Sequence, residues 1–358
     1  MRVDELDFEL PADRIATQPA EPRDAARLMV VRKQEGQIEH HHVRDLPDLL
    51  HPDDLLIWND SGVLAARLQG HRAYDGVRGG GHVEGLFIQQ RSDSRWLARL
   101  SAGGRLTEGE HITLTHGDHK TALTLIEREG DAWIVEHASD GVLEDMLDQC
   151  GFTPLPPYIR KARQDRCEEI DDSVDRTWYR TSYQREDRRG SIAAPTAGLH
   201  FTPDLIQRMT DRGIGNAAVT LHVGEGTFLP VKTETLEAHP MHQERWHVDG
   251  EALKRLIHGP GPSGRIVAVG TTTVRVLESL ARPLPEAACS GTTDLLIAPG
   301  HQFRRVDAMM TNFHLPRSTL LALVGAFLGM QLMARAYQIA IEQKYRFYSY
   351  GDAMLLLP

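Results

Sequence analysis

Five short segments in the C-terminal half of the chain combine glycine, threonine, histidine and phenylalanine at high density. They cover residues 194–201 (APTAGLHF), 220–228 (TLHVGEGTF), 269–275 (VGTTTVR), 311–316 (TNFHLP) and 345–354 (YRFYSYGDAM). Imidazoles exchange protons near neutral pH, glycines let a backbone approach a ligand closely, and aromatic rings stack on bases or cations. We therefore predict that these segments build one ligand pocket.

Three histidines occur in these segments beside a phenylalanine or a glycine turn. His200 precedes Phe201, His222 precedes the turn Gly224-Glu-Gly226, and His314 follows Phe313. For any one of them, a hydrogen-bonded histidine of the core is the alternative interpretation. Three such turns in one domain favour a shared pocket in which imidazoles act as general acids or bases.

A further ligand-binding turn is predicted over residues 266–275. The apolar run IVAV reads as a buried strand that breaks at Gly270, and Thr271 to Thr273 then begin a helix, where N–H groups converge on an anion. An ordinary capped helix start is the alternative. The nearby stretch 259–266 (GPGPSGRI) has the glycine spacing of a phosphate loop but lacks its Lys and Ser/Thr, which excludes a Walker-type ATPase.

Other catalytic signatures are missing from the sequence. His239, His242 and His247 are close in sequence, yet no HExxH pattern or cysteine pair accompanies them, so no metal site is expected. The three cysteines are widely spaced, which indicates neither a disulfide framework nor a metal cage and fits a reducing compartment. The sequence also has no Gly-x-Ser-x-Gly elbow, the signature of many serine hydrolases.

The elements that must position these residues fall into two patterns. Residues 63–149 contain short alternating runs separated by Gly- and Asp-rich turns, which is typical of a small all-β module. Before and after it, buried strands and helices alternate, ending in a long helical region over 318–344. The predicted fold is an α/β core domain, residues 1–62 and 150–358, interrupted by an inserted all-β domain, residues 63–149.

Charge and hydropathy limit the possible partners. The net charge of −10 argues against general coating of nucleic acid, although residues 67–105 carry seven arginines against three acids. The chain starts with acids rather than a basic signal-peptide region, and its longest apolar run, 320–330, is far shorter than the roughly 20 residues that cross a bilayer. We expect a cytoplasmic protein with no membrane contact.

With these residues assembled, the chain resembles the S-adenosylmethionine:tRNA ribosyltransferase-isomerase family of queuosine biosynthesis. The resemblance runs nearly end to end, through residues 7–28, LPPYI, GSIAAPTAGLHFT, TLHVGEGTFLPV, the Met241-His242-x-Glu244 element, IVAVGTTTVRVLES, VDAMMTNFHLPRSTLLALV and YRFYSYGDAM. It implies an α/β core with a barrel-like insert. It also implies an enzyme that transfers and isomerises the ribosyl part of S-adenosylmethionine onto the aminomethyl-deazaguanine wobble base of tRNA. The products are epoxyqueuosine-tRNA, adenine and methionine.

The resemblance turns the pocket into a set of expected roles. His200, His222 and His314 are the candidate proton carriers, Gly270 to Thr273 hold the methionine carboxylate or the ribose hydroxyls, and Phe201, Phe228 and Phe313 stack on the substrate. The remaining expected substrate contacts are Thr196, Gly198, Gly224, Gly226, Thr227, Arg275, Asn312, Arg346, Tyr350 and Asp352. S-adenosylmethionine is consumed as a substrate, so no separate cofactor and no metal are expected. The expected partner is the anticodon stem-loop of tRNA, bound by a monomer.

The chain also departs from the family pattern. Relatives usually carry Asn-Asn-Thr-Arg-Val where this chain has NDSGV at 59–63, so an arginine that could clamp a phosphate is missing. Two alternatives therefore stay open: a diverged paralogue that uses S-adenosylmethionine with a different acceptor, and a non-catalytic RNA-binding protein. Steep salt dependence of tRNA binding would separate a tRNA enzyme from a small-molecule enzyme.

Overall fold

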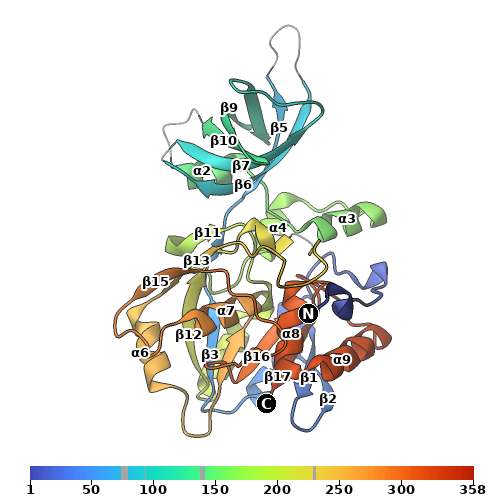
Figure 1. Ribbon diagram of the computed structural model, residues 1–358, viewed down its shortest axis with the longest axis vertical. Coiled ribbons are helices and arrows are strands. Elements are labelled where there is room, and N and C mark those ends of the chain that lie inside the picture. Colours follow the sequence, from blue (N-terminus) through green and yellow to red (C-terminus); the bar gives the residue numbers. More distant parts are fainter. Residues whose placement is uncertain (74–79, 93, 138–141, 229–230) are drawn as a thin grey trace.

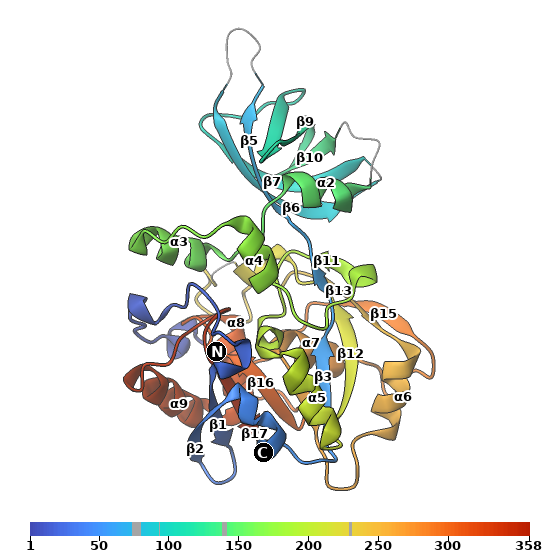
Figure 2. The same ribbon diagram turned by 180° about the vertical axis from the view of Figure 1, so that it is seen from behind.

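The structure is a computed structural model that describes residues 1–358 apart from 74–79, 93, 138–141 and 229–230. Within the described residues the chain forms a nine-stranded mixed sheet, a closed six-stranded barrel and a two-stranded ribbon. Figure 1 shows the barrel above the large sheet, with α3 (Pro157–Arg166) and α4 (Asp172–Trp178) between them. Figure 2 shows the same arrangement from behind. The predicted combination of an α/β sheet with an all-β barrel is present.

The large sheet runs in the order β15-β13-β12-β3-β14-β16-β17-β1-β2. The pairs β12·β3, β3·β14, β14·β16 and β17·β1 are parallel, and the other pairs are antiparallel. The strands span Cys289–Thr293 (β15), Glu244–Val248 (β13), Gly215–Leu221 (β12), Leu55–Asn59 (β3), Ile266–Val269 (β14), Ala308–Asn312 (β16), Ala353–Leu357 (β17), Arg27–Arg32 (β1) and Gln37–His42 (β2). Every residue of β3, β16 and β17 is buried, as expected for strands covered on both faces.

Helices cover both faces of this sheet. In β1, Met29 and Val31 face one hydrophobic cluster while Leu28 and Val30 face the other, because side chains alternate along a strand. The first cluster is covered by α6 (Gly250–His258), α7 (Thr271–Ser279), α8 (Thr319–Leu328) and α9 (Met330–Glu342), and the second by α1 (Leu46–Leu49) and α5 (Pro203–Asp211).

The long helical region predicted over 318–344 is two helices in the structure. Gly329 lies between α8 and α9 with φ of 86°, a conformation that favours glycine and stops the first helix. No single helix in the described part of the chain is long and apolar enough to cross a membrane. α8 and α9 meet that criterion only together, and they are bent by 115°.

The barrel closes in the order β10-β7-β6-β5-β8-β9. Its strands are Arg67–Arg72 (β5), His82–Gln90 (β6), Arg95–Ala102 (β7), His111–His116 (β8), His119–Glu129 (β9) and Ala132–His137 (β10). Trp96, Leu114 and Val135 fill its interior, and α2 (Leu143–Cys150) adds Leu147 to the same cluster. The barrel therefore has its own hydrophobic core, separate from the two clusters of the large sheet.

The chain passes between the barrel and the sheet at two adjacent points. The backbone of Arg67 donates to Phe152 O at 3.1 Å, and that of Phe152 donates to Arg67 O at 2.7 Å. A Cβ added to Gly151 would lie 1.9 Å from the carbonyl oxygen of Ala65, so only glycine fits this crossing. Nearby, β4 (Gly62–Val63) pairs with β11 (Arg189–Ser191). Short 3-10 helices occur at Val3–Leu6, Ala12–Arg14, Arg23–Ala25, Val43–Asp45, Glu186–Arg188, Thr196–His200 and Glu225–Phe228.

Candidate functional site

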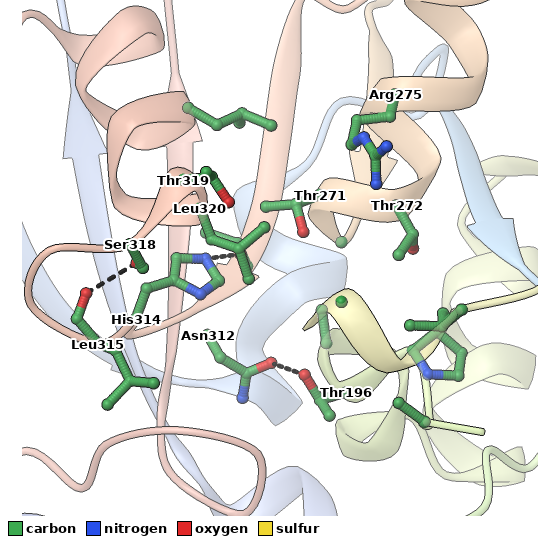
Figure 3. Close-up of a pocket in the computed structure, with 18 of the residues that line it drawn as sticks. Thr196, Thr271, Thr272, Arg275, Asn312, His314, Leu315, Ser318, Thr319 and Leu320 are labelled. Carbon is green, nitrogen blue, oxygen red and sulfur yellow. Dashed lines mark hydrogen bonds between the residues drawn. The ribbon is translucent and has the colours of Figure 1, made fainter. Parts of the chain in front are cut away.

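A cavity of about 240 Å³ opens at the carboxyl ends of β14 and β16. Parallel strands commonly present their ligand sites at this edge, because the loops that follow them splay apart there. The lining comes from residues 193–197, 239–242, 270–272 and 311–320, together with Tyr158, Tyr179, Val223, Gly226, Glu244, Arg275, 295–297, Leu323, Tyr348 and Ser349. Each of the five predicted segments contributes at least two of these residues, and Figure 3 shows part of the group.

The start of α7 forms one wall of the cavity. Gly270 follows β14 with φ of 88°, and among the described residues no side chain accepts the N–H groups of the first turn of α7. Thr271 and Thr272 line the cavity, whereas the hydroxyl of Thr273 donates to Val269 O at 2.8 Å and is buried. The predicted turn therefore exists with two of its three threonines at the cavity.

Asn312 connects the cavity to the residues behind it. Its Oδ1 accepts a hydrogen bond from the Thr196 hydroxyl at 3.0 Å, and both residues line the cavity (Figure 3). Its Nδ2 donates to Tyr348 O at 3.1 Å and lies 3.2 Å from His200 Nε2. His200 itself is buried and does not line the cavity. Burial, and then the positive charges of Arg346 and Arg23, lower the pKa of His200 to about 3, so its neutral ring accepts from Asn312.

His314 is the predicted histidine that reaches the cavity. Its Nε2 lies 2.8 Å from the Thr311 hydroxyl, and its backbone N–H donates to the Tyr337 hydroxyl at 3.0 Å. Figure 3 shows its ring in the group that includes Asn312 and Thr271. Burial lowers the pKa of His314 to about 3, so the imidazole is neutral at physiological pH.

His222 lies outside the cavity lining, at the end of β12. Its Nδ1 is 3.0 Å from the Ser61 hydroxyl, which is 2.7 Å from the Ser191 hydroxyl. A Cβ on Gly190 would meet the same ring nitrogen at 2.7 Å. Burial, followed by the positive charge of Arg245, lowers the pKa of His222 to about 4. The structure therefore brings only His314, of the three candidate proton carriers, to the cavity.

Arg275 lines the cavity but its guanidinium is fully engaged. It forms a short, buried ion pair with Glu244, and its Nε donates to Leu295 O at 3.1 Å. The other carboxylate oxygen of Glu244 accepts the N–H of Gly224 at 3.1 Å. This chain of contacts ties α7, β13 and the glycine turn together, so Arg275 shapes the wall rather than offering a free charge.

The glycine turn after β12 is only partly at the cavity. Gly226 lines it, and a Cβ there would lie 2.6 Å from the His242 ring, so the turn needs glycine for this close approach. Gly224 is not among the lining residues. The side chains of Thr227 and Phe228 lie outside the described residues.

Several other predicted contacts face the core instead of the cavity. Phe201 packs against Trp58 and Tyr183, and a Cβ on Gly198 would meet the Tyr183 hydroxyl at 2.0 Å. Phe313 belongs to the cavity wall, but its side chain is fully buried against other aromatic rings.

The predicted segment 345–354 makes most of its contacts within the protein core. Asp352 is buried and accepts the backbone N–H groups of Arg27 at 3.0 Å and Arg346 at 2.8 Å. Tyr350 packs edge-on against Trp178. None of these residues lines the cavity, because the turn directs only Tyr348 and Ser349 toward it.

Several residues of the cavity lining were not predicted from the sequence. Tyr158 at the start of α3 lies 2.6 Å from the Ser349 hydroxyl and 4.5 Å, centroid to centroid, from the Tyr348 ring. Burial raises the pKa of Tyr158 to about 12, so its hydroxyl stays protonated. His239 and His242 also line the cavity. The strings LPPYI and Met241-His242-x-Glu244 contain Tyr158 and His242 and could have identified these two residues.

The histidines at the cavity do not form a metal centre in the part of the chain that the structure describes. No group of three or more His, Cys, Asp or Glu side chains there is arranged to hold an ion. The described lining therefore offers hydroxyls, imidazoles, amides, an open helix start and the charged side chains of Arg317 and of the Arg275–Glu244 pair.

A ligand cavity at the carboxyl ends of parallel strands, lined by such groups, defines an α/β enzyme with a small-molecule site. The family model described as queuosine biosynthesis protein matches residues 3–356, so the chain belongs to that family, as the sequence predicted. Proteins named S-adenosylmethionine:tRNA ribosyltransferase-isomerase match it across their length. The one from Chelativorans sp. (strain BNC1) is 47% identical over 99% of both chains, and that from Rhizobium etli is 46% identical over 99% of both.

A solved structure gives the same result. The crystal structure of S-adenosylmethionine tRNA ribosyltransferase from Thermotoga maritima is 34% identical, covers 99% of this chain and 100% of its own, and has a TM-score of 0.55. These similarities extend over both the barrel and the large sheet.

Proposed function

We propose that this protein transfers and isomerises the ribosyl moiety of S-adenosylmethionine onto the aminomethyl-deazaguanine wobble base of tRNA. The products are epoxyqueuosine-tRNA, adenine and methionine. The observation that carries this proposal is the full-length similarity, at up to 47% identity, to relatives named for this activity. A purely RNA-binding role is not favoured, because these relatives are named as enzymes and the chain keeps a built cavity.

The cavity offers suitable contacts for a sulfonium nucleoside. The uncapped start of α7, Gly270 to Thr273, would receive the methionine carboxylate or the ribose hydroxyls, because helix N-termini favour anions and oxygen acceptors. The rings of Tyr158 and Tyr348 would lie beside the positive sulfonium, which aromatic faces attract. The pair Arg275–Glu244 would hold the wall in place while adding no net charge.

His314 is the best placed group for proton transfer. The reaction needs a base for the proton on the carbon beside the sulfonium, and a proton donor for the departing adenine. A neutral imidazole that faces the cavity can accept the first proton and then donate it to adenine. His200 would act as a positioning residue, since it contacts the cavity only through Asn312.

Several further features complete the proposal. The barrel would be a domain inserted at residues 63–149 into an α/β core formed by 1–62 and 150–358. S-adenosylmethionine would be consumed as a substrate without a separate cofactor. The enzyme would act as a monomer in the cytoplasm on the anticodon stem-loop of tRNA.

The decisive experiment combines the purified protein, S-adenosylmethionine and tRNA that carries the aminomethyl-deazaguanine base. We expect adenine release together with a mass increase of the tRNA. Adenine release without a change in the tRNA would instead assign a different acceptor and support the paralogue. If the assay shows no adenine release and no mass change of the tRNA, the proposed function is wrong.

A further inference from the structure

A second, smaller recess of about 200 Å³ lies where the barrel meets α3. It is lined by Arg67, Glu84, Gly85, Leu86, Arg99, Ser101, Pro154, Leu155, Pro157 and Arg160. We call this recess the barrel crevice. Figures 1 and 2 show the barrel and α3 on either side of this junction. Two guanidinium groups enter the crevice from opposite sides, Arg67 from β5 and Arg160 from α3.

The Arg67 guanidinium forms no ion pair within the described residues, and that of Arg160 has only a loose one with Glu84. The backbone of Arg67 exchanges two hydrogen bonds with Phe152, so its position is set by the domain junction. The Nε atoms of Arg67 and Arg160 are buried, and neither has a hydrogen-bond partner within the described ranges. The carboxylate beside them, on Glu84, is 3.7 Å from Arg160 Nη1, which is too long for a hydrogen bond.

The positive charges of Arg67 and Arg160 repel each other in the crevice, so a negatively charged ligand would stabilise them. Burial, followed by the positive charge of Arg160, lowers the pKa of Arg67. A group of opposite charge between the two guanidinium groups would relieve this repulsion. Pro157, the first residue of α3, also lines the crevice, so the positive end of the helix dipole lies there as well.

Other arginines of the barrel behave differently. Arg91 pairs with Glu129 at 2.6 Å and Arg95 pairs with Glu136 at 2.9 Å. Arg99, although it touches the crevice, pairs with Asp131 and Glu225. Most of the described arginines between residues 67 and 105 therefore have carboxylate partners, which for Arg99 include Glu225 of the core. Arg67 has none among the described residues, and Arg160 has only the loose contact with Glu84.

We propose that Arg67 and Arg160 form a binding site for a phosphodiester group of the tRNA backbone. Guanidinium groups match phosphate oxygens with paired N–H donors, and the apolar side chains of Leu86 and Leu155 can pack against the sugar. The proposal rests on the proposed function, since it assumes that tRNA is the partner.

The position of the crevice relative to the main cavity fits this ligand. Tyr158 and Arg160 are two residues apart on α3, about 200° around a helix, and they line the main cavity and the barrel crevice respectively. An RNA strand gripped at the crevice would thus place an adjoining nucleotide close to the catalytic cavity on the other side of α3.

The test measures tRNA affinity at several salt concentrations for Arg67→Gln, Arg160→Gln and the double variant. We expect the double variant to bind tRNA about tenfold more weakly near 0.15 M salt. The slope of log affinity against log salt concentration should become less steep by about 0.7 to 0.9, because one phosphate contact is lost. Binding of S-adenosylmethionine should not change. An unchanged salt slope would overturn the proposal.

Two further variants control for general effects of charge and folding. Arg95→Gln removes an exposed barrel arginine that is paired with Glu136, and should change tRNA affinity by less than about twofold. Glu84→Gln removes the carboxylate beside Arg160 and should strengthen tRNA binding, which no folding defect would produce. An equal loss in Arg95→Gln, or weaker binding in Glu84→Gln, would contradict a specific site.

If the wild-type protein does not modify tRNA, the proposed function fails. If it does modify tRNA while the double variant keeps the wild-type salt slope, only this inference fails.

Discussion

A glycine turn lies at each end of β14, and the two turns differ in sequence and in use. At the amino end, the loop 259–265 packs against the segment that begins β3. A Cβ on Gly264 would lie 2.0 Å from Asp53 O, and Arg265 is paired with the buried carboxylate of Asp54 at 2.6 Å. At the carboxyl end, the nearest atoms to a Cβ on Gly270 are 3.6 Å away, and the cavity begins there.

The difference shows what glycine spacing can and cannot indicate. At the amino end the missing side chains make room for the protein's own backbone and carboxylates, which also accept the N–H of Arg265 at 2.8 Å. At the carboxyl end Gly270 makes the turn, and the helix start remains available. The rejection of a Walker-type loop at 259–266 thus has a structural reason as well as a missing lysine.

The largest expected difference between the two ends is in turnover. Replacing His314 with Ala should lower turnover by about 10²- to 10⁴-fold, the usual contribution of an acid–base group, with little change in S-adenosylmethionine affinity. Ser263→Ala, in the loop at the amino end, should leave turnover unchanged. Adenine release under single-turnover conditions measures both. Full turnover in His314→Ala would move the proton-transfer role to another lining group, and full turnover in Ala variants of His200, His222 and His314 alike would refute the whole scheme.

The second prediction concerns the ion pairs at the two ends. Arg275→Met leaves the buried carboxylate of Glu244 without its cation and should reduce the free energy of unfolding by about 3–5 kcal/mol. Arg265→Met at the amino end should cost less, because Asp54 keeps its backbone donors. Urea unfolding compares the two variants. The double variant Arg275→Met/Glu244→Gln should recover much of the loss, and no recovery would show that the charge was not the cause.

The third prediction compares the two glycines directly. Gly264→Ala forces a Cβ against a backbone oxygen and should destabilise the protein by about 1–3 kcal/mol while leaving turnover of the folded enzyme unchanged. Gly270→Ala meets no close atom but must adopt φ near 88°, and should lose turnover because the start of α7 shifts. Thermal unfolding and adenine release measured on both variants test the distinction. If both substitutions changed turnover equally, the two glycines would not differ in function.

The smallest effect, measured per pH unit, is a response to acid at the carboxyl end. His200 and His314 have a pKa of about 3 in the folded protein, below the ordinary value near 6.5. Between these values the unfolded state binds more protons, so stability falls as pH decreases from about 6.5, by up to roughly 1.4 kcal/mol per pH unit for each histidine. His314→Asn should flatten this slope, and an unchanged slope in this variant would contradict the prediction. Urea midpoints from pH 7 downward provide the comparison.

Much of the fold followed from patterns that report directly on burial. A strand that is buried on both faces gives a continuous apolar run, as in β3 and β14, and a strand that is buried on one face gives an alternating run, as in the barrel. Both kinds of strand could therefore be recognised in the sequence. The break at Gly329 was not foreseen. Apolar residues continue on both sides of it, so the period of the pattern hides the turn.

The site was predictable in part for a similar reason. Thr196, Thr272 and Asn312 follow strand ends or turns, and their polar side chains do reach the cavity. His200 faces the core because of the local path of the backbone, which the residue types in this segment do not reveal. Tyr158 was missed because α3 reaches the cavity from more than 30 residues upstream of the first predicted segment, a proximity that only the tertiary fold creates.

The reciprocal hydrogen bonds between Arg67 and Phe152 also have a mechanical consequence. Two chain crossings bonded side by side form a flat strap, which we expect to bend across its thin direction more easily than it twists. The paired crossings should therefore limit rotation of the barrel relative to the core more than a single tether would. Energy transfer between one dye on the barrel and one on the core should give a narrow distribution of distances, and a broad distribution would contradict this expectation.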